Sequence, residues 1–340
     1  MPTIREIAKL AGVSPATVSR VMNGTAKVDD EKRKRVEKAI RETGFQPNML
    51  ARALFKNSSR LIGLILPDIM NPFFNELASI IEEEAYGGGF HIVLCSSGNK
   101  PEKEIANIRM LEQMKVDGII LITNGSHTEE IISSCSLPVV VVDRHVAGCG
   151  EIAYIEADHY KGGRIATQHL VDNGCRNIVC LRGPQRYASG ALRYRGYQDV
   201  CRENNITERF IDTRYNYEAG LKAGEELLEK FHSIDGIVAA NDMVAISVYK
   251  VLRRHNIRIP EDVQLIGFDD IGFSSLVSPE ITTVHQPIAD MGKRAVEILL
   301  NYVSGQDFKE ENIFDVQLVV RQTTGKGTRT MSEPDGTMEV

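Results

Sequence analysis

The chain has 340 residues, of which 42% are hydrophobic and 25% are charged, as expected for a soluble globular protein of two or three domains. No run of about 18 to 20 apolar residues could span a membrane, and the N-terminus lacks the apolar region of a secretory signal. The net charge of −6 is divided unevenly: residues 1–60 carry thirteen Lys/Arg and six Asp/Glu, whereas the remaining residues carry 27 and 40. A basic head on an acidic body predicts a small nucleic-acid-binding module attached to a larger domain.

The basic head predicts three short helices. Thr3, followed three residues later by Glu6, suits the start of an amphipathic helix over residues 4–11. Gly12 permits a tight turn, and Ser14 with Pro15 suits the start of a second helix that ends near residues 23–24. A third helix is expected from residue 29 or 30 to about residue 43. Two helices of about eight residues around a glycine-containing turn indicate a helix-turn-helix.

The second helix of such a motif lies in the DNA major groove. Arg20 faces outward and can donate two hydrogen bonds to a guanine, whereas Pro15 and Ala16 offer apolar contact. Ser14, Thr17 and Asn23 are better suited to phosphates. The expected DNA-contacting residues of the head are Thr3, Ser14, Pro15, Ala16, Thr17, Ser19, Arg20 and Asn23. The alternative is a small helical bundle that binds protein.

The segment that follows the head predicts a helix of one to two turns from Asn48 to Leu54, which is too short to be stable alone in water. The run from Ile-x-x-Ile-Ala-x-x-Ala-Gly-Val-Ser-x-x-Thr-Val-Ser-Arg to Phe-x-Pro-Asn-x-x-Ala-Arg-x-Leu resembles the headpiece and hinge of the lactose/galactose repressor family. The resemblance implies that Asn48, Ala51, Arg52 and Leu54 contact DNA. It implies that two hinge helices pair in the minor groove and that Leu54 wedges between the central base pairs.

From residue 60 onward, short apolar runs alternate with helical patterns, which predicts parallel sheets with helices on both faces. The expected strands are Leu61–Leu66, His91–Cys95, Gly118–Ile122, Val139–Val142, Ile178–Leu181, Gly236–Ala240 and Val263–Phe268. The expected helices include Phe74–Glu84, Lys103–Gln113, Arg164–Asn173 and Tyr217–Lys230. Because the pattern restarts near Tyr160, we expect a two-lobed, doubly wound α/β domain.

Polar and aromatic side chains follow most of these strands, at the edge where ligands of open α/β sheets bind. Aromatic rings, amides, carboxylates and arginines in one cleft suit a neutral polyhydroxyl ligand. An Asn or Asp in such a place often only caps the next helix, and this alternative stays open for each residue singly. The groups in question are Asp68, Asn71, Phe73, Phe74, Asp143, Arg144, Arg182, Arg193, Asn241, Asp242, Asp269, Asp270, His285 and Gln286.

These residues carry a second resemblance, which extends over about 320 positions. Asn71-Pro-Phe-Phe74, Asp143-Arg144, Asn241-Asp242, Gly267-Phe-Asp-Asp270 and Thr282-Thr-Val-His-Gln-Pro287 resemble the effector domain of the same family, which is similar to periplasmic sugar-binding proteins. Asn-Pro-Phe-Phe with Asp-Arg most resembles the ribose-binding members. The implied ribose ligands are Asn71, Phe73, Phe74, Asp143, Arg144, Arg193, Asn241, Asp269 and Gln286, with Tyr217 as a further stacking residue.

The expected domains are a helix-turn-helix DNA-binding domain at 1–46, a hinge helix and linker at 47–59, a two-lobed sugar-binding and dimerisation domain at 60–324, and a disordered tail at 325–340. The tail is rich in Gly, Thr, Ser, Pro and Asp and lacks the leucine heptads of a tetramer, so a homodimer is expected. The six cysteines form no C-x-x-C pair, which predicts reduced thiols and no metal site.

Together these features predict a bacterial cytoplasmic, nucleoid-associated repressor that a small sugar, ribose, releases from a palindromic operator. The opposite sign, corepression, is the less favoured alternative. The same features are compatible with a global carbon-catabolite regulator that responds to a phosphoprotein, or with an effector that is another sugar, a sugar phosphate or a purine. No G-x-S-x-G, phosphate loop or zinc-ligand cluster is present, so we expect neither an enzyme nor a cofactor.

Overall fold

The computed structural model describes residues 2–23, 28–45, 58–123, 132, 135–143, 152–308 and 311–325. Within it the chain forms two compact units, Met1–Arg60 and Leu61–Val340. The expected hinge residues Asn48, Ala51, Arg52 and Leu54, the cleft residue Arg144 and the tail beyond residue 325 lie outside the described residues. No helix in the described part is long and apolar enough to cross a membrane.

In its described residues the first unit has the three predicted helices: α1 (Ile4–Ala11), α2 (Pro15–Asn23) and α3 (Asp30–Thr43). Thr3 and Glu6 form the expected capping box at α1, and Gly12 ends that helix in the left-handed conformation at φ 62°. Ser14 Oγ accepts a hydrogen bond from the Thr17 amide at 3.2 Å, as an N-cap does. The helices pack around a small core made of Ile7, Ala8, Ala11, Val18, Val36 and Ala39.

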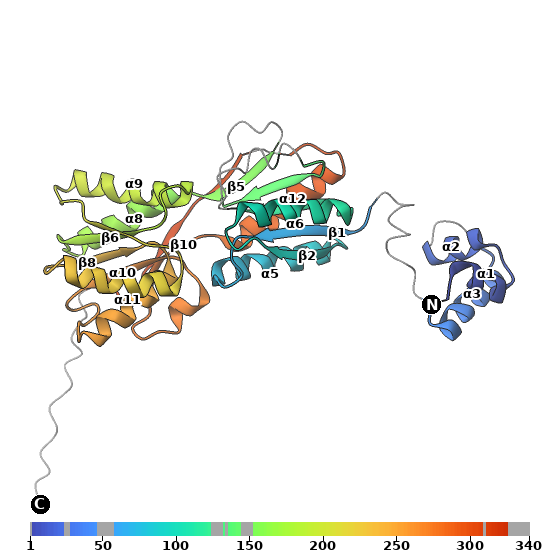
Figure 1. The fold of residues 1–340 in the computed structure, drawn as a ribbon, viewed down its shortest axis with the longest axis horizontal. Coiled ribbons are helices and arrows are strands. Elements are labelled where there is room, and N and C mark those ends of the chain that lie inside the picture. The colour runs from blue at the N-terminus through green and yellow to red at the C-terminus, as the bar shows by residue number, and fades with distance from the viewer. Residues whose placement is uncertain are drawn as a thin grey trace, which may run out of the picture. The chain divides into compact units, whose positions relative to one another are not determined.

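The second unit consists of two lobes, each built on a six-stranded sheet (Figure 1). The first sheet has the order β11-β5-β4-β3-β1-β2 and the second β12-β10-β9-β8-β6-β7. Neighbouring strands are parallel except β10 and β12, which are antiparallel. The strands are β1 (Leu61–Leu66), β2 (His91–Ser96), β3 (Gly118–Ile122), β4 (Val139–Val142), β5 (Ala153–Ala157), β6 (Ile178–Arg182), β7 (Phe210–Asp212), β8 (Gly236–Ala239), β9 (Gln264–Asp269), β10 (Thr282–His285), β11 (Glu311–Phe314) and β12 (Gln317–Val319).

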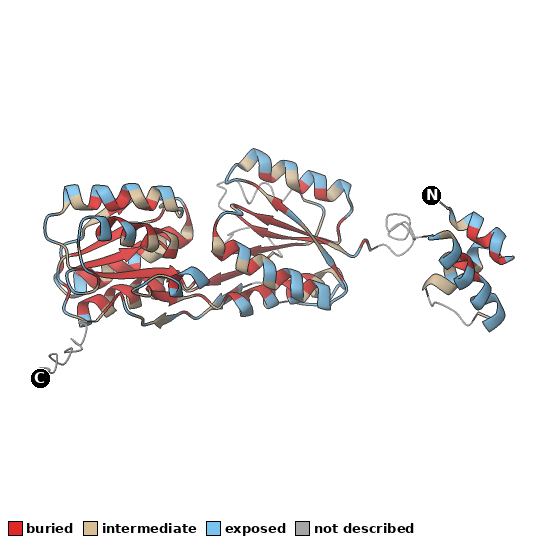
Figure 2. Ribbon diagram, turned by 90° about the horizontal axis from the view of Figure 1, so that it is seen from below, coloured by how far each residue is buried: buried red, intermediate tan, exposed pale blue. Residues whose placement is uncertain are grey.

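Helices cover both faces of each sheet. In the first lobe α5 and α12 pack on one face and α6 on the other, and in the second lobe α8 and α9 lie opposite α10 and α11 (Figure 1). These helices, with the short 3-10 helix η1, are α5 (Pro72–Gly87), α6 (Pro101–Gln113), α8 (His159–Asp172), α9 (Ala188–Glu203), α10 (Tyr217–Lys230), α11 (Asp242–Arg254), η1 (Gly272–Ser275) and α12 (Ile288–Val303). Figure 2 shows the buried residues concentrated in the two sheets and on the inner helix faces. The predicted two-lobed, doubly wound architecture is therefore confirmed.

The chain passes between the lobes three times. It leaves the first lobe after β5 and enters α8, returns after β10 to form α12, and crosses again between β11 and β12. The predicted restart near Tyr160 matches the first crossing, but the two later crossings were not predicted. Because each lobe is completed by a strand from the end of the chain, the lobes form one continuous unit with three short connections.

Candidate ligand cavity and DNA-reading helix

Helix α2, expected to read DNA, presents part of its surface to solvent. Pro15, Ala16 and Arg20 are exposed and Thr17 and Ser19 are half-buried, whereas Val18 lies in the core. Ser14 and Thr17 share a hydroxyl hydrogen bond of 2.9 Å. Arg20, in the last turn of α2, reaches solvent on this face. The side chain of Asn23 lies outside the described residues, and Thr3 is exposed at the start of α1.

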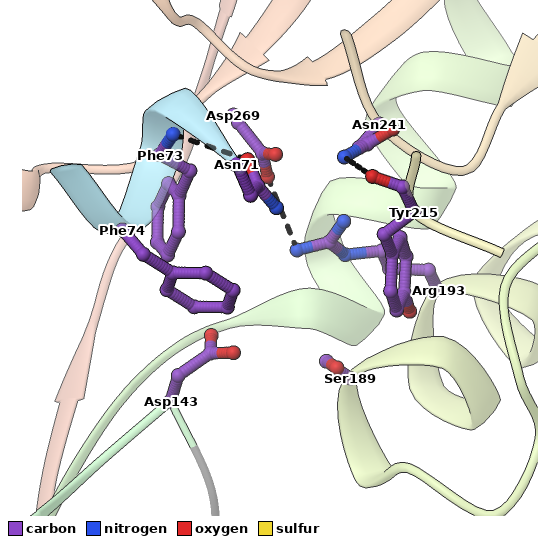
Figure 3. A pocket seen from close by; sticks show the side chains of 9 residues that line it. All are labelled: Asn71, Phe73, Phe74, Asp143, Ser189, Arg193, Tyr215, Asn241 and Asp269. Carbon is purple, nitrogen blue, oxygen red and sulfur yellow. Dashed lines mark hydrogen bonds and ion pairs between the residues drawn. The ribbon is translucent and has the colours of Figure 1, made fainter. Parts of the chain in front are cut away.

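A small cavity of about 20 Å³ lies between the lobes of the second unit. This is the space of about one water molecule, so a sugar can enter only if the lining side chains or the lobes move. Asn71, Phe73, Phe74 and Asp143 enter from the first lobe, and Figure 3 shows them facing residues of the second lobe. The lining residues from the second lobe are Ser189, Arg193, Tyr215, Asn241 and Asp269. Seven of the ten residues expected to bind ligand therefore line one cavity.

The carboxyl ends of the parallel strands place these groups together. Asn71 follows β1 and Asp143 follows β4, while Asn241 follows β8 and Asp269 ends β9. Each asparagine also caps a helix, since Asn71 Oδ1 accepts from the Phe73 amide at 3.1 Å and Asn241 Oδ1 from the Val244 amide at 3.0 Å. Both residues thus cap a helix, as the sequence left open, and both still line the cavity wall.

Arg193 and Asp269 form the hydrogen-bonded centre of the site, and both belong to the sugar ligands that the family resemblance implies. Arg193 Nη2 lies 3.4 Å from Asp269 Oδ1, and Nη1 donates to the Ala240 carbonyl at 2.8 Å. The guanidinium also stacks on the Phe268 ring, 3.6 Å from its centroid. Burial raises the pKa of Asp269 to about 8, with Arg193 and Gln286 acting in the opposite direction. A hydroxyl-bearing ligand would meet an oriented donor and an oriented acid at this centre.

The backbone at Asp269 holds an uncommon conformation. Asp269 has φ 110° and Asp270 has φ 60°, and a non-glycine residue in this region is strained. The two carboxylates consequently point to different partners: Asp270 binds His285 and Arg321, while Asp269 enters the cavity. The two neighbouring carboxylates therefore do not share one site.

Asp242 braces this end of the second sheet from inside. Its Oδ2 accepts from the Ile271 amide at 3.0 Å and from Ser274 Oγ at 2.6 Å, and its Oδ1 accepts from Thr283 Oγ1 at 2.6 Å. Burial raises the pKa of Asp242 to about 7. The carboxylate therefore joins α11 to η1 and β10, and it supports the backbone on both sides of Asp269.

Two expected ligand residues lie outside the cavity wall. Gln286 is buried behind it, and its Nε2 donates to Asp269 Oδ1 at 2.7 Å, so it orients that carboxylate. Tyr217 begins α10, and its hydroxyl accepts a hydrogen bond from Lys250 Nζ at 2.6 Å. Tyr215, two residues earlier, lines the cavity instead, together with Ser189. Neither was predicted, because Tyr215 follows the short strand β7 and Ser189 lies in the first turn of α9.

Several buried polar atoms at the cavity have no hydrogen-bond partner among the described residues. They are Asp143 Oδ1 and the Tyr215 hydroxyl in the cavity wall, and Gln286 Oε1 behind it. Leaving such groups unpaired costs about 1–3 kcal/mol each. These donors and acceptors therefore fit a ligand that brings several hydroxyl groups. The rings of Phe73 and Phe74, with centroids 5.3 Å apart, supply apolar faces beside them.

Comparison with known proteins covers both units. Residues 3–48 match the model of the bacterial regulatory proteins of the lacI family, and residues 167–324 match the periplasmic binding protein-like domain. The ribose operon repressor of Halalkalibacterium halodurans is 37% identical over 328 residues, covering 96% of this chain and 98% of that protein. The transcriptional repressor PurR of Vibrio vulnificus is 33% identical over 335 residues, with coverages of 96% and 99%. Both relatives are named as repressors.

Solved structures agree with the sequence relatives. The lac repressor dimer bound to operator and the anti-inducer ONPF superposes with a TM-score of 0.87 at 27% identity, covering 95% of this chain and 99% of that one. A regulator from Alkaliphilus metalliredigens complexed with D-xylulofuranose gives 0.72 at 33% identity, and one from Enterococcus faecium with bound ribose gives 0.70 at 27%. Both cover 78% of this chain and 99% of theirs. The chain belongs to the lacI family of bacterial regulatory proteins.

Proposed function

We propose that this protein is a sequence-specific DNA-binding repressor of a sugar-utilisation operon, with ribose as its effector, acting in the cytoplasm as a homodimer. The observation that carries the proposal is the cavity between the lobes, where Phe73 and Phe74 face Arg193 and Asp269. Aromatic faces next to fixed hydrogen-bonding groups are the chemistry that binds a small sugar.

The sugar acts on DNA binding through the two lobes. Its hydroxyl groups would bond to Asp143 and Asn71 of the first lobe and to Arg193, Asn241 and Asp269 of the second. A ligand that contacts both lobes favours the conformation in which they are closer. Closure changes the distance between the two DNA-binding heads of a dimer. The ligand-bound dimer then binds the operator with lower affinity, and this loss is the coupling free energy between the two sites.

The head supplies the DNA contacts. Pro15, Ala16, Ser19 and Arg20 lie on the side of α2 that suits base edges of the major groove, while the hydroxyl groups of Ser14 and Thr17 suit phosphates. Thr3, exposed at the start of α1, is a further proposed DNA contact. Asn23, Asn48, Ala51, Arg52 and Leu54 complete the proposed DNA-binding set, and Arg144, Gln286 and Tyr217 remain proposed members of the ligand site.

The experiment that tests the ligand is calorimetric titration of the full chain with D-ribose, beside a panel of other sugars, sugar phosphates and purines. The expected result is one-site binding of D-ribose and no heat from purines. Binding of another panel member in place of D-ribose would replace ribose as the effector. If no member of the panel binds, a protein effector would be favoured. The purine arm matters because a relative named PurR is 33% identical to this chain.

A further inference from the structure

His159 occupies the point where the chain first crosses between the lobes. It is the first residue of α8 and follows directly on β5 and the helix cap Asp158. Its side chain is fully buried beside the Phe268 ring, with centroids 6.0 Å apart, and it does not line the ligand cavity. It lies between two cavity residues that come from different lobes, Asp143 and Arg193.

The contact with Arg193 determines where the imidazole carries its proton. Arg193 Nε lies 3.4 Å from His159 Nδ1, and a guanidinium can only donate hydrogen bonds. Nδ1 must therefore be the acceptor, and the proton of the neutral ring is on Nε2. Burial lowers the pKa of His159 and Arg193 lowers it further, whereas Asp143 and Asp158 act against them. The ring is thus a neutral donor at Nε2.

The donor atom faces an unpaired acceptor across the lobe boundary. His159 Nε2 lies 3.6 Å from Asp143 Oδ1, which is longer than an N–H···O hydrogen bond of about 2.7–3.2 Å. Both atoms are buried, and neither has a hydrogen-bond partner within the described residues. A relative movement of roughly 0.5 Å would pair them.

We propose that His159 is a positioning residue for effector binding: its Nε2–H donates a hydrogen bond to Asp143 Oδ1 when a ligand is bound between the lobes. This inference rests on the proposed function, because it requires a small ligand between the lobes. The bond would fix one oxygen of Asp143 and leave the other for a ligand hydroxyl. It would also connect Asp143 of the first lobe, through the imidazole, to Arg193 and Asp269 of the second.

The first test is a double-mutant cycle in the full chain, with D-ribose as the probe in calorimetry. His159→Phe keeps a ring of similar shape without nitrogen atoms, and Asp143→Ala removes the acceptor. We expect His159→Phe to bind ribose about tenfold more weakly and the double variant to bind no more weakly than Asp143→Ala alone. The role of His159 would be overturned if the double variant lost affinity by the product of the two single fold-changes. It would also be overturned if His159→Phe bound ribose as tightly as the wild type.

His159→Gln is the conservative variant, since its terminal amide retains one donor and one acceptor. It should recover most of the affinity lost in His159→Phe. If both variants lose affinity equally, His159 contributes shape alone and the hydrogen bond is not its role. The same variant keeps the test usable if His159→Phe does not fold.

The second test observes the proton itself, in the full chain labelled with ¹⁵N-histidine, with His159→Gln used to identify the signals. We expect His159 to be the neutral Nε2–H form in the free protein, and its Nε2 proton to move downfield at saturating D-ribose. A proton on Nδ1, or a bound-state spectrum in which the Nε2 signal is unchanged, would contradict the inference. Failure of the wild-type protein to bind any sugar would instead contradict the proposed function, and the tautomer would still be tested.

Discussion

Asp269 shows how a single backbone conformation decides which carboxylate serves the cavity. Its φ of 110° turns its side chain toward Arg193 and Gln286, while Asp270 turns toward His285 and Arg321. An aspartate after a buried strand could be predicted from the sequence as a cavity residue. The supporting role of Gln286 could not, because an amide that donates to another side chain leaves no pattern in the sequence.

At about pH 8.5, where Asp269 is mostly ionised, Asp269→Asn should weaken binding of D-ribose roughly 10- to 100-fold, since a hydrogen bond to a charged group contributes about 1.5–3 kcal/mol. Titration calorimetry measures the change. Asp270→Asn is the matched control, because Asp270 is the next residue and does not line the cavity. Equal losses in the two variants would mean that the effect comes from the strand end as a whole and not from a ligand contact.

Binding of D-ribose should become tighter as pH rises from about 6.5 to 8.5. The pKa of Asp269 is about 8 in the free protein, so this carboxyl is largely protonated below that pH. Ligand hydroxyls donate to the carboxylate and favour its ionised form, so binding releases a proton and gains affinity as pH approaches 8. Calorimetry across this range tests the sign. In Asp269→Asn the affinity for D-ribose should not change with pH. If that variant shows the same pH dependence as the wild type, the released proton comes from another group.

At the scale of elements, α8 and α9 approach so closely that only glycine fits between them. A Cβ on Gly163 would lie 2.1 Å from the Arg193 carbonyl oxygen, and one on Gly196 would lie 2.4 Å from the Tyr160 carbonyl oxygen. This packing sets the position of the α9 backbone from which Arg193 reaches Asp269. The glycines were visible in the sequence, but their contacts depend on the packing of two separate helices and could not be predicted.

Gly163→Ala should lower the free energy of unfolding by about 1–3 kcal/mol, as overpacking does, and should also weaken binding of D-ribose because Arg193 moves. Gly87→Ala is the control, since a Cβ at this exposed residue at the end of α5 meets nothing within 4 Å. Thermal unfolding with and without ribose separates the two effects. If Gly163→Ala and Gly87→Ala had the same stability and the same ribose affinity, the close contact between α8 and α9 would not affect either property.

Arg20→Ala should weaken binding to the specific operator roughly 5- to 150-fold, from the loss of about 1–3 kcal/mol of base discrimination, and should affect nonspecific DNA much less. Fluorescence anisotropy with operator and scrambled duplexes measures both, after the operator has been selected from a random library. Arg41→Ala, an exposed residue in the last turn of α3, is the charge-matched control. Equal effects of the two variants would contradict α2 as the helix that reads bases.

The elements that could be predicted are those with strong local patterns. The capped helices of the head and strands such as β3 and β4, which are apolar throughout, follow from the sequence. The predicted strand His91–Cys95 and helix Arg164–Asn173 extend further than expected, to Ser96 and from His159. The strands β5, β7, β10, β11 and β12 were not predicted. In strands of three to five residues with polar or exposed positions, such as Glu156 in β5, the alternation of apolar and polar residues is too short to identify a strand.

At the scale of the whole molecule, the effector unit is arranged for a movement of one lobe against the other. Three short connections join the lobes, and the cavity takes four lining residues from the first lobe and five from the second. The two-lobed architecture was predictable from the alternation of strands and helices. The interleaving of α12, β11 and β12 was not, because a sequence pattern indicates the type of an element and not the sheet it joins.

The measurement that tests the account most directly is the affinity of the full chain for its operator with and without saturating D-ribose, by fluorescence anisotropy at fixed salt. We predict that ribose weakens operator binding by roughly 5- to 150-fold, the range typical of coupled sites, and leaves nonspecific DNA binding unchanged. Operator affinity that stays the same while calorimetry shows ribose bound in the cavity would contradict the claim that the cavity controls the DNA-binding head.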